Sequence, residues 1–465
     1  MALTKTNTLI FICIFLLFGL FISKYFEPIS LYYFLIFSLL AVIFYRFKTA
    51  FIFTVCLAAF AGGLYRGGLL QQQNLSYQDF YYKKVTITGI ASEDGFYSDS
   101  SQLEFTVGSV KVDGKSIPGK VKIKGFGSPA VYRYDLVEAT GKLYPSVGSR
   151  QASMSYADIN VIATTNSLID NIRTKFIIGI ETSLPEPAAS FAIGILVGQR
   201  SLLPEYLMEA LTIVGLVHIV AVSGYNLTII VNFVRRIGSK LSRFQLLFIS
   251  LLLIYGFILI SGFSPSIVRA SLVSFLSLTA WYFGRKIRPA LLILLVASIT
   301  AFYNPYYIWS DIGWYLSFLA FVGILIIAPI LISLFRIKNN NGFASMAVES
   351  FSAQLMTTPL IMMIFGRVSL IGIIANIIIV PLVPLAMFFS FIAGLIGAIL
   401  PNLSAYLAIP ARLLLNLMIL ITEKLATVPG AYKLVSVGFI AMLLIYGSIL
   451  IFYIGLRKRL QSVKI

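Results

Sequence analysis

The chain has 465 residues, of which 58% are hydrophobic and only 12% charged, and its formal net charge is +18. A soluble domain carries about a quarter charged residues, so this composition excludes an ordinary water-soluble protein. The positive residues gather in short loops between apolar segments, where such clusters mark the cytoplasmic side of a membrane. The clusters are Arg235, Arg236, Lys240 and Arg243; Arg285, Lys286 and Arg288; Arg336 and Lys338; and Arg457–Arg459. The net charge is therefore weak support for nucleic-acid binding.

Three apolar segments at the start of the chain predict membrane-spanning helices, because about 20 apolar residues cross the hydrocarbon core. They are Leu9–Ile22, Ile29–Tyr45 and Ala50–Leu64. The first segment has some features of a secretory signal, but no small-residue cleavage site follows it, so we interpret it as a retained helix. With Lys5 in the cytoplasm, three crossings place the chain after Arg66 outside.

The next stretch has the composition of a small β domain. Between residues 71 and 165 there are ten Lys or Arg and nine Asp or Glu, so the charges nearly balance. Short segments rich in Val, Ile, Thr and Tyr alternate with turn-forming residues, which predicts strands. They are Lys84–Ile90, Ser101–Val107, Ser109–Val112, Gly119–Gly125 and Asp135–Leu143. About five strands in this length suit an OB-like barrel, although spacing alone does not fix the topology.

The remaining chain returns to the membrane. Leu168–Pro187 is amphipathic and predicts a helix that lies in the membrane interface. Apolar segments then recur as far as Leu456. Phe191–Val197 and the region around Pro381 and Pro384 are short or interrupted, which predicts re-entrant or broken helices.

We therefore expect a polytopic α-helical membrane protein with an inserted extracytoplasmic small β-barrel (OB-like) domain. The expected divisions are N-terminal transmembrane helices over 1–66, the OB-like domain over 67–165, the amphipathic interfacial helix over 166–186 and a transmembrane channel domain over 187–465. An odd number of crossings after the OB-like domain places the C-terminus in the cytoplasm. The expected location is the cytoplasmic membrane.

Polar residues inside membrane segments are costly and tend to be functional, so they are candidates for a site. Four groups stand out. The first group has His218, Ser223, Gly224 and Asn226; the second has Arg269; the third has Asp311 and Ser317; the fourth has Gln354, Arg367 and Asn376.

The first group raises two possibilities. His218 and Ser223 suggest an intramembrane serine hydrolase, but residues five apart point about 140° away from each other on a regular helix. The alternative is a pore in which Ser223 and Gly224 unwind the helix and expose backbone groups. His218 is the only histidine, and Cys13 and Cys56 lie in apolar segments. We therefore expect no catalytic residues, no metal site and no cofactor.

Arg269 also allows two interpretations. It lies a few residues inside an apolar segment, so it needs an acid, backbone carbonyls or water as a partner. Asp311 and Glu349 are the acids expected at a comparable depth. A pair of this kind could serve only to lock helices together, whereas an arginine on the channel wall would contact substrate. For His218, a contact within the helix bundle and a contact with substrate both remain open.

The four groups, in this order and with these separations, resemble the membrane domain of the ComEC family of DNA-uptake proteins. That family shows a Gly-Leu-x-His…Ser-Gly segment, an Arg-Ala segment after a Ser-Pro turn, an Asp-x-x-x-x-Leu-Ser-Phe segment and an Asn-x-x-x-x-Pro segment. The matching segments here are Gly215–Asn226, Ser264–Ala270, Asp311–Phe318 and Asn376–Pro381. The leading helices and OB-like domain also match, so the resemblance covers nearly the whole chain.

The resemblance implies a channel that imports single-stranded DNA into the cytoplasm during natural transformation. Many family members continue into a metallo-β-lactamase-like domain thought to degrade the strand that is not transported. This sequence stops at Ile465, and one histidine cannot supply the His-x-His-x-Asp-His motif. We therefore expect a transport channel, not an enzyme, that works with a separate nuclease, a periplasmic or surface DNA receptor and a cytosolic ATP-driven motor.

The OB-like domain is the expected first contact with DNA. Its basic residues and aromatic residues could hold phosphates and stack on bases. The candidates are Lys111, Lys115, Lys120, Lys122 and Lys124, with Phe105, Phe126, Tyr132 and Tyr134 as stacking faces. An ordinary solvated sheet face with core aromatics is the other possibility.

Two further functions remain open at this point. The same scaffold could transport another anionic polymer or a lipid-linked substrate, because a fold does not determine function. A purely structural membrane protein is the third option, and the intramembrane Arg269 and Asp311 argue against it.

Overall fold

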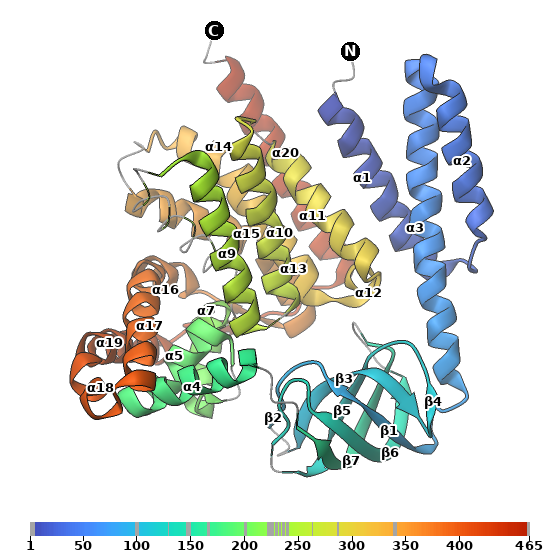
Figure 1. The fold of residues 1–465 in the computed structure, drawn as a ribbon. Coiled ribbons are helices and arrows are strands. Elements are labelled where there is room, and N and C mark those ends of the chain that lie inside the picture. The colour runs from blue at the N-terminus through green and yellow to red at the C-terminus, as the bar shows by residue number, and fades with distance from the viewer. Residues whose placement is uncertain are drawn as a thin grey trace. The chain divides into compact units, whose positions relative to one another are not determined.

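The computed structural model of the chain (Figure 1) describes residues 5–97, 102–128, 130–145, 150–164, 168–199, 202–220, 227, 231, 234, 238, 241–262, 264–285, 288–337 and 342–462. The chain divides into two compact units. Unit 1 contains Met1–Ser167 and Leu294–Tyr315, and unit 2 contains Leu168–Ile293 and Leu316–Ile465.

Unit 1 begins with three helices, α1 (Lys5–Ile22), α2 (Leu31–Ile43) and α3 (Lys48–Gln78), and α3 packs against both of the others. Glycines bring the backbones of α1 and α3 together. A Cβ atom on Gly63 would lie 2.5 Å from the Leu16 carbonyl oxygen, and one on Gly19 would lie 2.2 Å from that of Phe60. Small residues at such crossings are typical of membrane helices, where packing replaces the hydrophobic effect.

The segment Leu294–Tyr315 belongs to unit 1 because it is hydrogen-bonded to these helices. It contains most of α11 (Pro289–Tyr303) and all of α12 (Tyr306–Ser310). Trp309 Nε1 donates to the Leu20 carbonyl oxygen at 2.7 Å, and Arg66 Nη2 donates to that of Tyr303 at 2.6 Å. The divisions expected from the sequence do not separate this segment from the channel domain, and α3 continues as one helix past residue 66.

The remainder of unit 1 is a seven-stranded sheet. Its strands are β1 (Lys84–Ala91), β2 (Phe96–Tyr97), β3 (Leu103–Val112), β4 (Lys115–Ser116), β5 (Val121–Gly127), β6 (Leu136–Pro145) and β7 (Ala152–Ala163). The five long strands pair in the series β1–β6–β7–β5–β3, and β3 pairs again with β1. The series therefore returns to its first member. The β5–β7 pair is parallel, and the other long pairs are antiparallel.

Alternate residues of the five long strands face one apolar core, as the two-residue period of a strand requires. Phe105, Ile123, Leu143 and Met154 are fully buried there. Tyr77, near the end of α3, is buried in the same core and fixes that helix to the sheet. The predicted segments Ser101–Val107 and Ser109–Val112 form one strand, β3. The sequence prediction missed β7 entirely.

Unit 2 contains the other helices and a small second sheet. Its first helices are α4 (Leu168–Ser183), α5 (Ala188–Val197), α6 (Glu205–Ile213), α7 (Val217–Val220), α9 (Arg243–Ser261) and α10 (Pro265–Tyr282). Then come α13 (Ile312–Val322), a π-helical turn (Gly323–Ile327), α14 (Ala328–Leu334), α15 (Gly342–Phe365), β8 (Arg367–Ser369), α16 (Gly372–Ile379), a 3-10 turn (Val380–Leu382) and α17 (Val383–Ile399). The last elements are α18 (Pro401–Leu407), α19 (Ile409–Ala426), β9 (Tyr432–Leu434) and α20 (Phe439–Ser462).

Among the described residues, seven helices are long and apolar enough to cross a membrane, or up to eight if one bent pair counts as a span. The seven are Thr6–Tyr25, Lys48–Gln78, Arg243–Ser261, Ile312–Leu334, Ala344–Phe365, Gly372–Ile399 and Phe439–Arg459. The bent pair is α18 and α19, which meet at 54°. The predicted class of polytopic helical membrane protein is therefore confirmed.

The two interrupted segments of unit 2 differ in burial: α5 is fully buried, and Val380–Leu382 is half-buried. All ten residues of α5 are buried. The 3-10 turn at Val380–Leu382 interrupts the helix at Pro381, as the prolines predicted. Helix α4 crosses α17 closely, because a Cβ atom on Gly397 would lie 1.9 Å from the Gly179 carbonyl oxygen. Ser183 Oγ adds a hydrogen bond to the Ala393 carbonyl oxygen at 2.9 Å.

Candidate functional site

The first polar group begins at a tight turn between α6 and α7. Gly215 has φ +76°, a conformation that residues with a side chain rarely adopt. The turn exposes His218, whose Nδ1 lies 3.1 Å from the Gly215 carbonyl oxygen. Ser223, Gly224 and Asn226 lie outside the described residues, so their proposed roles stay predictions.

The fourth polar group meets this turn at Gly372, the first residue of α16. A Cβ atom on Gly372 would lie 3.1 Å from Ser369 Oγ, 3.2 Å from Gln354 Nε2 and 3.3 Å from the Val214 carbonyl oxygen. A Cβ atom on Gly215 would lie 3.2 Å from Ser369 Cβ. The glycines therefore allow polar groups from four elements to converge. Val214, Gly215, Gln354, Ser369, Gly372 and Asn376 are called the Gly372 cluster below.

Hydrogen bonds hold only part of this cluster. Gln354 Nε2, on α15, donates to the Ser369 carbonyl oxygen at 3.1 Å. Gln354 Oε1, Ser369 Oγ and Asn376 Oδ1 are buried and have no hydrogen-bond partner within the described chain. Asn376 is four residues from Gly372 on α16, so the two share a helix face. An unsatisfied buried polar atom costs about 1–3 kcal/mol, so the cluster is suited to a polar ligand or to water.

A two-stranded sheet lies next to the cluster. β8 pairs with β9 so that Arg367 is opposite Leu434, Val368 opposite Lys433 and Ser369 opposite Tyr432. Arg367 is exposed and two residues from Ser369, so it lies on the same face of β8. Lys433 is exposed on the opposite face. Positive charge therefore lies on both faces of a strand pair that also contributes to the Gly372 cluster.

Sequence reasoning identified Gln354, Arg367 and Asn376 but missed Ser369 and Gly372. The available signal was the short Ser-Leu-Ile-Gly stretch over 369–372, which separates two apolar helices just before Asn376.

Arg269 lies one turn into α10. This helix begins at Pro265, and Ser264 Oγ accepts a hydrogen bond from the Ile267 backbone N–H at 3.4 Å. Arg269 is 1% exposed and is the largest of the fully buried side chains. Its Nη2 donates to Ser266 Oγ at 3.2 Å. The structure thus places the second polar group inside the protein.

The third polar group is split between the units. Asp311 lies in unit 1, where its Oδ1 accepts a hydrogen bond from the Trp314 backbone N–H at 2.8 Å. Ser317 is half-buried on α13 in unit 2. Glu349 is half-buried on α15. The pairing of Arg269 with Asp311 or Glu349 stays a prediction.

The lysines of the sheet domain do not form one free basic patch. Glu104 on β3 forms ion pairs with Lys122 and with Lys124, the latter at 2.6 Å, both on β5. Burial alone would raise the pKa of the Glu104 carboxyl, but the two lysines outweigh it and hold that pKa below its ordinary value. Lys111, Lys115 and Lys120 are exposed.

The aromatic candidates differ in position. Phe126 on β5 is 50% exposed, and its ring centroid lies 6.4 Å from that of Tyr156 on β7. Tyr132 and Tyr134 are also exposed, and the Arg133 guanidinium lies 4.9 Å from the Tyr134 ring centroid. Phe105 was expected as a stacking face, which is wrong, because alternation along β3 turns it into the core. Tyr156, which sequence reasoning missed, is 75% exposed.

These features define the class: a multi-pass helical membrane protein with a sheet domain and buried polar residues in its membrane part. Residues 195–459, more than half of the chain, match the model of the Competence protein family. The chain belongs to this family, and the predicted membership in the ComEC family is confirmed.

One curated relative is similar over part of its length. The chain is 25% identical to "ComE operon protein 3" of Bacillus subtilis (strain 168) over 225 residues, which are 48% of this chain and 28% of that protein. The chain thus covers well under two thirds of that relative. No solved structure matches the chain.

Proposed function

We propose that this protein is a channel that imports single-stranded DNA into the cytoplasm during natural transformation. The observation that carries the proposal is the Competence family match over 195–459, a segment that contains the Gly372 cluster and Arg269. A path for a polyanion needs cationic or hydrogen-bonding walls. Arg269 and Arg367 supply positive charge and the Ser369 hydroxyl can supply a donor, while the unsatisfied amide oxygens of the cluster can accept from base N–H groups.

We propose that the DNA path includes the exposed cations of the β8–β9 sheet and the buried polar groups of the Gly372 cluster. Arg367 and Lys433 are exposed on that sheet and would contact phosphates. The amide oxygens of Gln354 and Asn376, which have no partner in the described chain, can accept hydrogen bonds from base N–H groups of a passing strand. His218 is exposed beside the same turn and belongs to this set. Ser223, Gly224, Asn226, Asp311 and Ser317 remain candidates for the path on the resemblance alone.

We further propose that the sheet domain is an OB-like barrel that lies outside the cytoplasm and receives the strand. Its support is the returning series of five strands with one parallel pair. Phe126 and Tyr156 offer two neighbouring exposed rings for base stacking. Binding should be weak and should fall steeply with salt, as phosphate contacts do.

The partners that fit this function are a DNA receptor outside the membrane, a separate nuclease for the second strand and a cytosolic ATP-driven motor. The membrane orientation that fits it has the C-terminus, with Arg457–Arg459, in the cytoplasm. An epitope tag at the C-terminus that protease reaches only after the cells are permeabilised would support this orientation.

Transformation frequency in the native host tests the function. The wild type would be compared with a deletion strain and with Arg269→Ala, and membrane levels of the protein would be measured in each strain. Loss of transformation in both, with the variant present at wild-type level, supports a DNA channel with Arg269 on its path. Normal transformation in the deletion strain would refute DNA import and favour transport of another anionic polymer or a lipid-linked substrate.

A further inference from the structure

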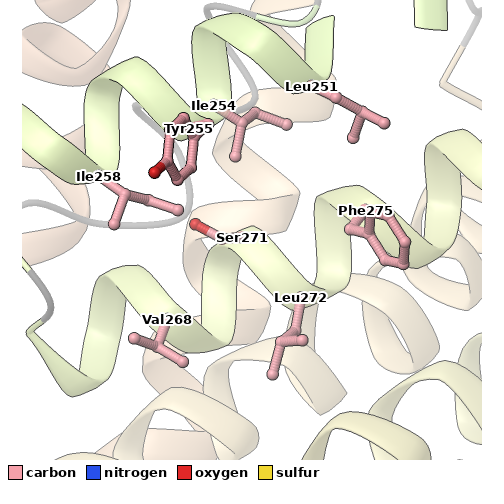
Figure 2. Close-up of a pocket in the computed structure, with 8 residues that line it drawn as sticks. All are labelled: Leu251, Ile254, Tyr255, Ile258, Val268, Ser271, Leu272 and Phe275. Atoms are coloured by element: carbon pink, nitrogen blue, oxygen red, sulfur yellow. The ribbon is translucent and has the colours of Figure 1, made fainter. Parts of the chain in front are cut away.

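Helices α9 and α10 enclose a groove whose lining contains none of the residues assigned to the DNA path. Its volume is about 350 Å³, in the range of small-molecule sites. The lining residues are Leu251, Ile254, Tyr255 and Ile258 from α9 and Val268, Ser271, Leu272 and Phe275 from α10 (Figure 2). Apart from two hydroxyl groups the lining is apolar, so the groove suits a hydrocarbon chain.

One of those hydroxyl groups belongs to Ser271 on α10. Ser271 is 8% exposed, and its Oγ is buried without a hydrogen-bond partner among the described residues. Figure 2 shows this oxygen directed into the space between the two helices. The described residues therefore leave one polar atom of the groove lining without a hydrogen bond.

The surroundings of the groove are those of a lipid-facing surface. α9 is long and apolar enough to span a membrane, and only 11% of its apolar stretch is buried inside the protein. Phe248 and Leu252, on the same helix, are both more than half exposed, at 59% and 57%. In a membrane, the molecules that meet such a surface are the acyl chains of lipids.

Positive charge marks one end of the groove. α9 starts at Arg243 and Arg285 follows α10, and the ring centroids of Phe244 and Tyr282 lie 6.4 Å apart, so these two helix ends are adjacent. Both arginines are exposed. At 1.5 Å per residue, Leu251 and Ile258 lie roughly 12 and 23 Å along α9 from Arg243. A long acyl chain anchored at the arginines reaches Leu251, the near part of the groove, but not Ile258, because half of the hydrocarbon core is about 15 Å thick.

We propose that this groove binds one acyl chain of an anionic phospholipid whose headgroup is held by Arg243 and Arg285. Moving a chain from the bilayer into the groove gains no hydrophobic energy, because lipid tails are as apolar as the lining. Selectivity therefore comes from the headgroup. Two arginines near the surface give a preference for anionic over neutral lipid of roughly thirtyfold, about fivefold for each arginine.

Native mass spectrometry of the full-length protein in detergent tests the proposal. The probes are dioleoyl phosphatidylglycerol, dioleoyl phosphatidylcholine and dilauroyl phosphatidylglycerol. We expect one retained dioleoyl phosphatidylglycerol, little retention of the neutral lipid, and weaker retention of the short-chain anionic lipid, whose tails extend less far along the groove. Equal retention of the neutral lipid, or of the short-chain lipid, would overturn the proposal.

Variants locate the bound lipid. Leu272→Trp fills the groove and should abolish retention, whereas Leu252→Trp makes the same change on the exposed surface of α9 and should not. Arg243→Gln and Arg285→Gln should each weaken retention roughly fivefold. If Leu272→Trp is not monodisperse, Ser271→Leu fills the groove with a smaller side chain and should have the same effect. Unchanged lipid retention in the groove variants would show that lipid does not occupy the groove. The same conclusion would follow if the protein proved to be a dimer and the groove variants separated its subunits without losing lipid.

Discussion

Adding a single methyl group at Gly372 tests whether the polar groups that converge there contribute to transport. In Gly372→Ala, the new Cβ atom would meet Ser369 Oγ at 3.1 Å, Gln354 Nε2 at 3.2 Å and the Val214 carbonyl oxygen at 3.3 Å. These distances are shorter than a carbon atom normally tolerates, so the three groups must move apart. The Val214 carbonyl is the least free to move, because Gly215, the next residue, holds the backbone in a tight turn.

The expected magnitude follows from these contacts. Overpacking a closely packed site costs about 1–3 kcal/mol. Movement of Gln354 also weakens its hydrogen bond to Ser369, which contributes about 1 kcal/mol. The overpacking penalty alone lowers the ratio of native to displaced junction roughly 5- to 150-fold. Transformation frequency should fall within that range while the protein remains in the membrane.

Gly256→Ala on α9 is the matched control, because a Cβ atom there would meet nothing within 4 Å. The assay compares transformation frequency and membrane level for both variants and the wild type. Gly372→Ala should lower transformation at normal membrane level, and Gly256→Ala should change neither. If the two variants behave alike, the polar junction at Gly372 does not contribute to transport.

Three further predictions concern unit 1. Glu104→Gln removes two ion pairs and should destabilise the sheet domain by about 1 kcal/mol, measured by urea unfolding at neutral pH. The expected loss is this small because both lysines are partly exposed to solvent, which weakens their ion pairs. Because the pKa of Glu104 is lowered in the folded state, its contribution is present above about pH 4.5 and is lost as the pH falls below that value, so wild type and variant should converge in acid. The same variant should strengthen single-stranded DNA binding by the protein in nanodiscs, because Lys122 and Lys124 lose their counter-charge; weaker binding would place the strand elsewhere. Phe126→Ala and Tyr156→Ala should each weaken that binding by about 1–3 kcal/mol, because each removes a ring on which a base could stack. Tyr97→Ala is the control, because Tyr97 is exposed but lies outside this ring pair. Equal effects of all three substitutions would argue against stacking at the pair.

The sequence predicted the class of fold well because its signals are local. Long apolar segments, basic loops and alternating strands each report on a few neighbouring residues. β7 escaped prediction because its inward residues include Ala152 and Ala157, which carry little hydrophobic signal. Tyr156 also has φ +56° at an irregular step in the pairing, which breaks the two-residue alternation. Phe105 was left open between a stacking face and the core, because a single aromatic residue does not show which face of β3 it occupies.

The candidate site was only partly predictable for a different reason. Polar residues in apolar segments identified Gln354, Arg367 and Asn376 one by one, but not their neighbours in space. Ser369 and Gly372 carry no chemical signal of their own, and their importance comes from the contact with Val214 and Gly215, far away in the sequence. The ion pairs of Glu104 with Lys122 and Lys124 were missed for the same reason, because they join two strands whose pairing the sequence did not specify.

The Gly372 cluster also bears on how the separate polar segments act. Gly215 begins one segment that resembles the ComEC family, and Gly372 lies four residues before another, Asn376–Pro381. In the structure, a Cβ atom on Gly215 would crowd Ser369, and one on Gly372 would crowd the Val214 carbonyl oxygen, so the two segments pack against each other through their glycines. Substitutions at the two positions should therefore be non-additive: once Gly372→Ala has displaced Ser369, Gly215→Ala loses its clash with Ser369 and retains only the strain of φ +76°, so it should lower transformation less than it does alone. Additive losses would mean that the two segments serve transport independently.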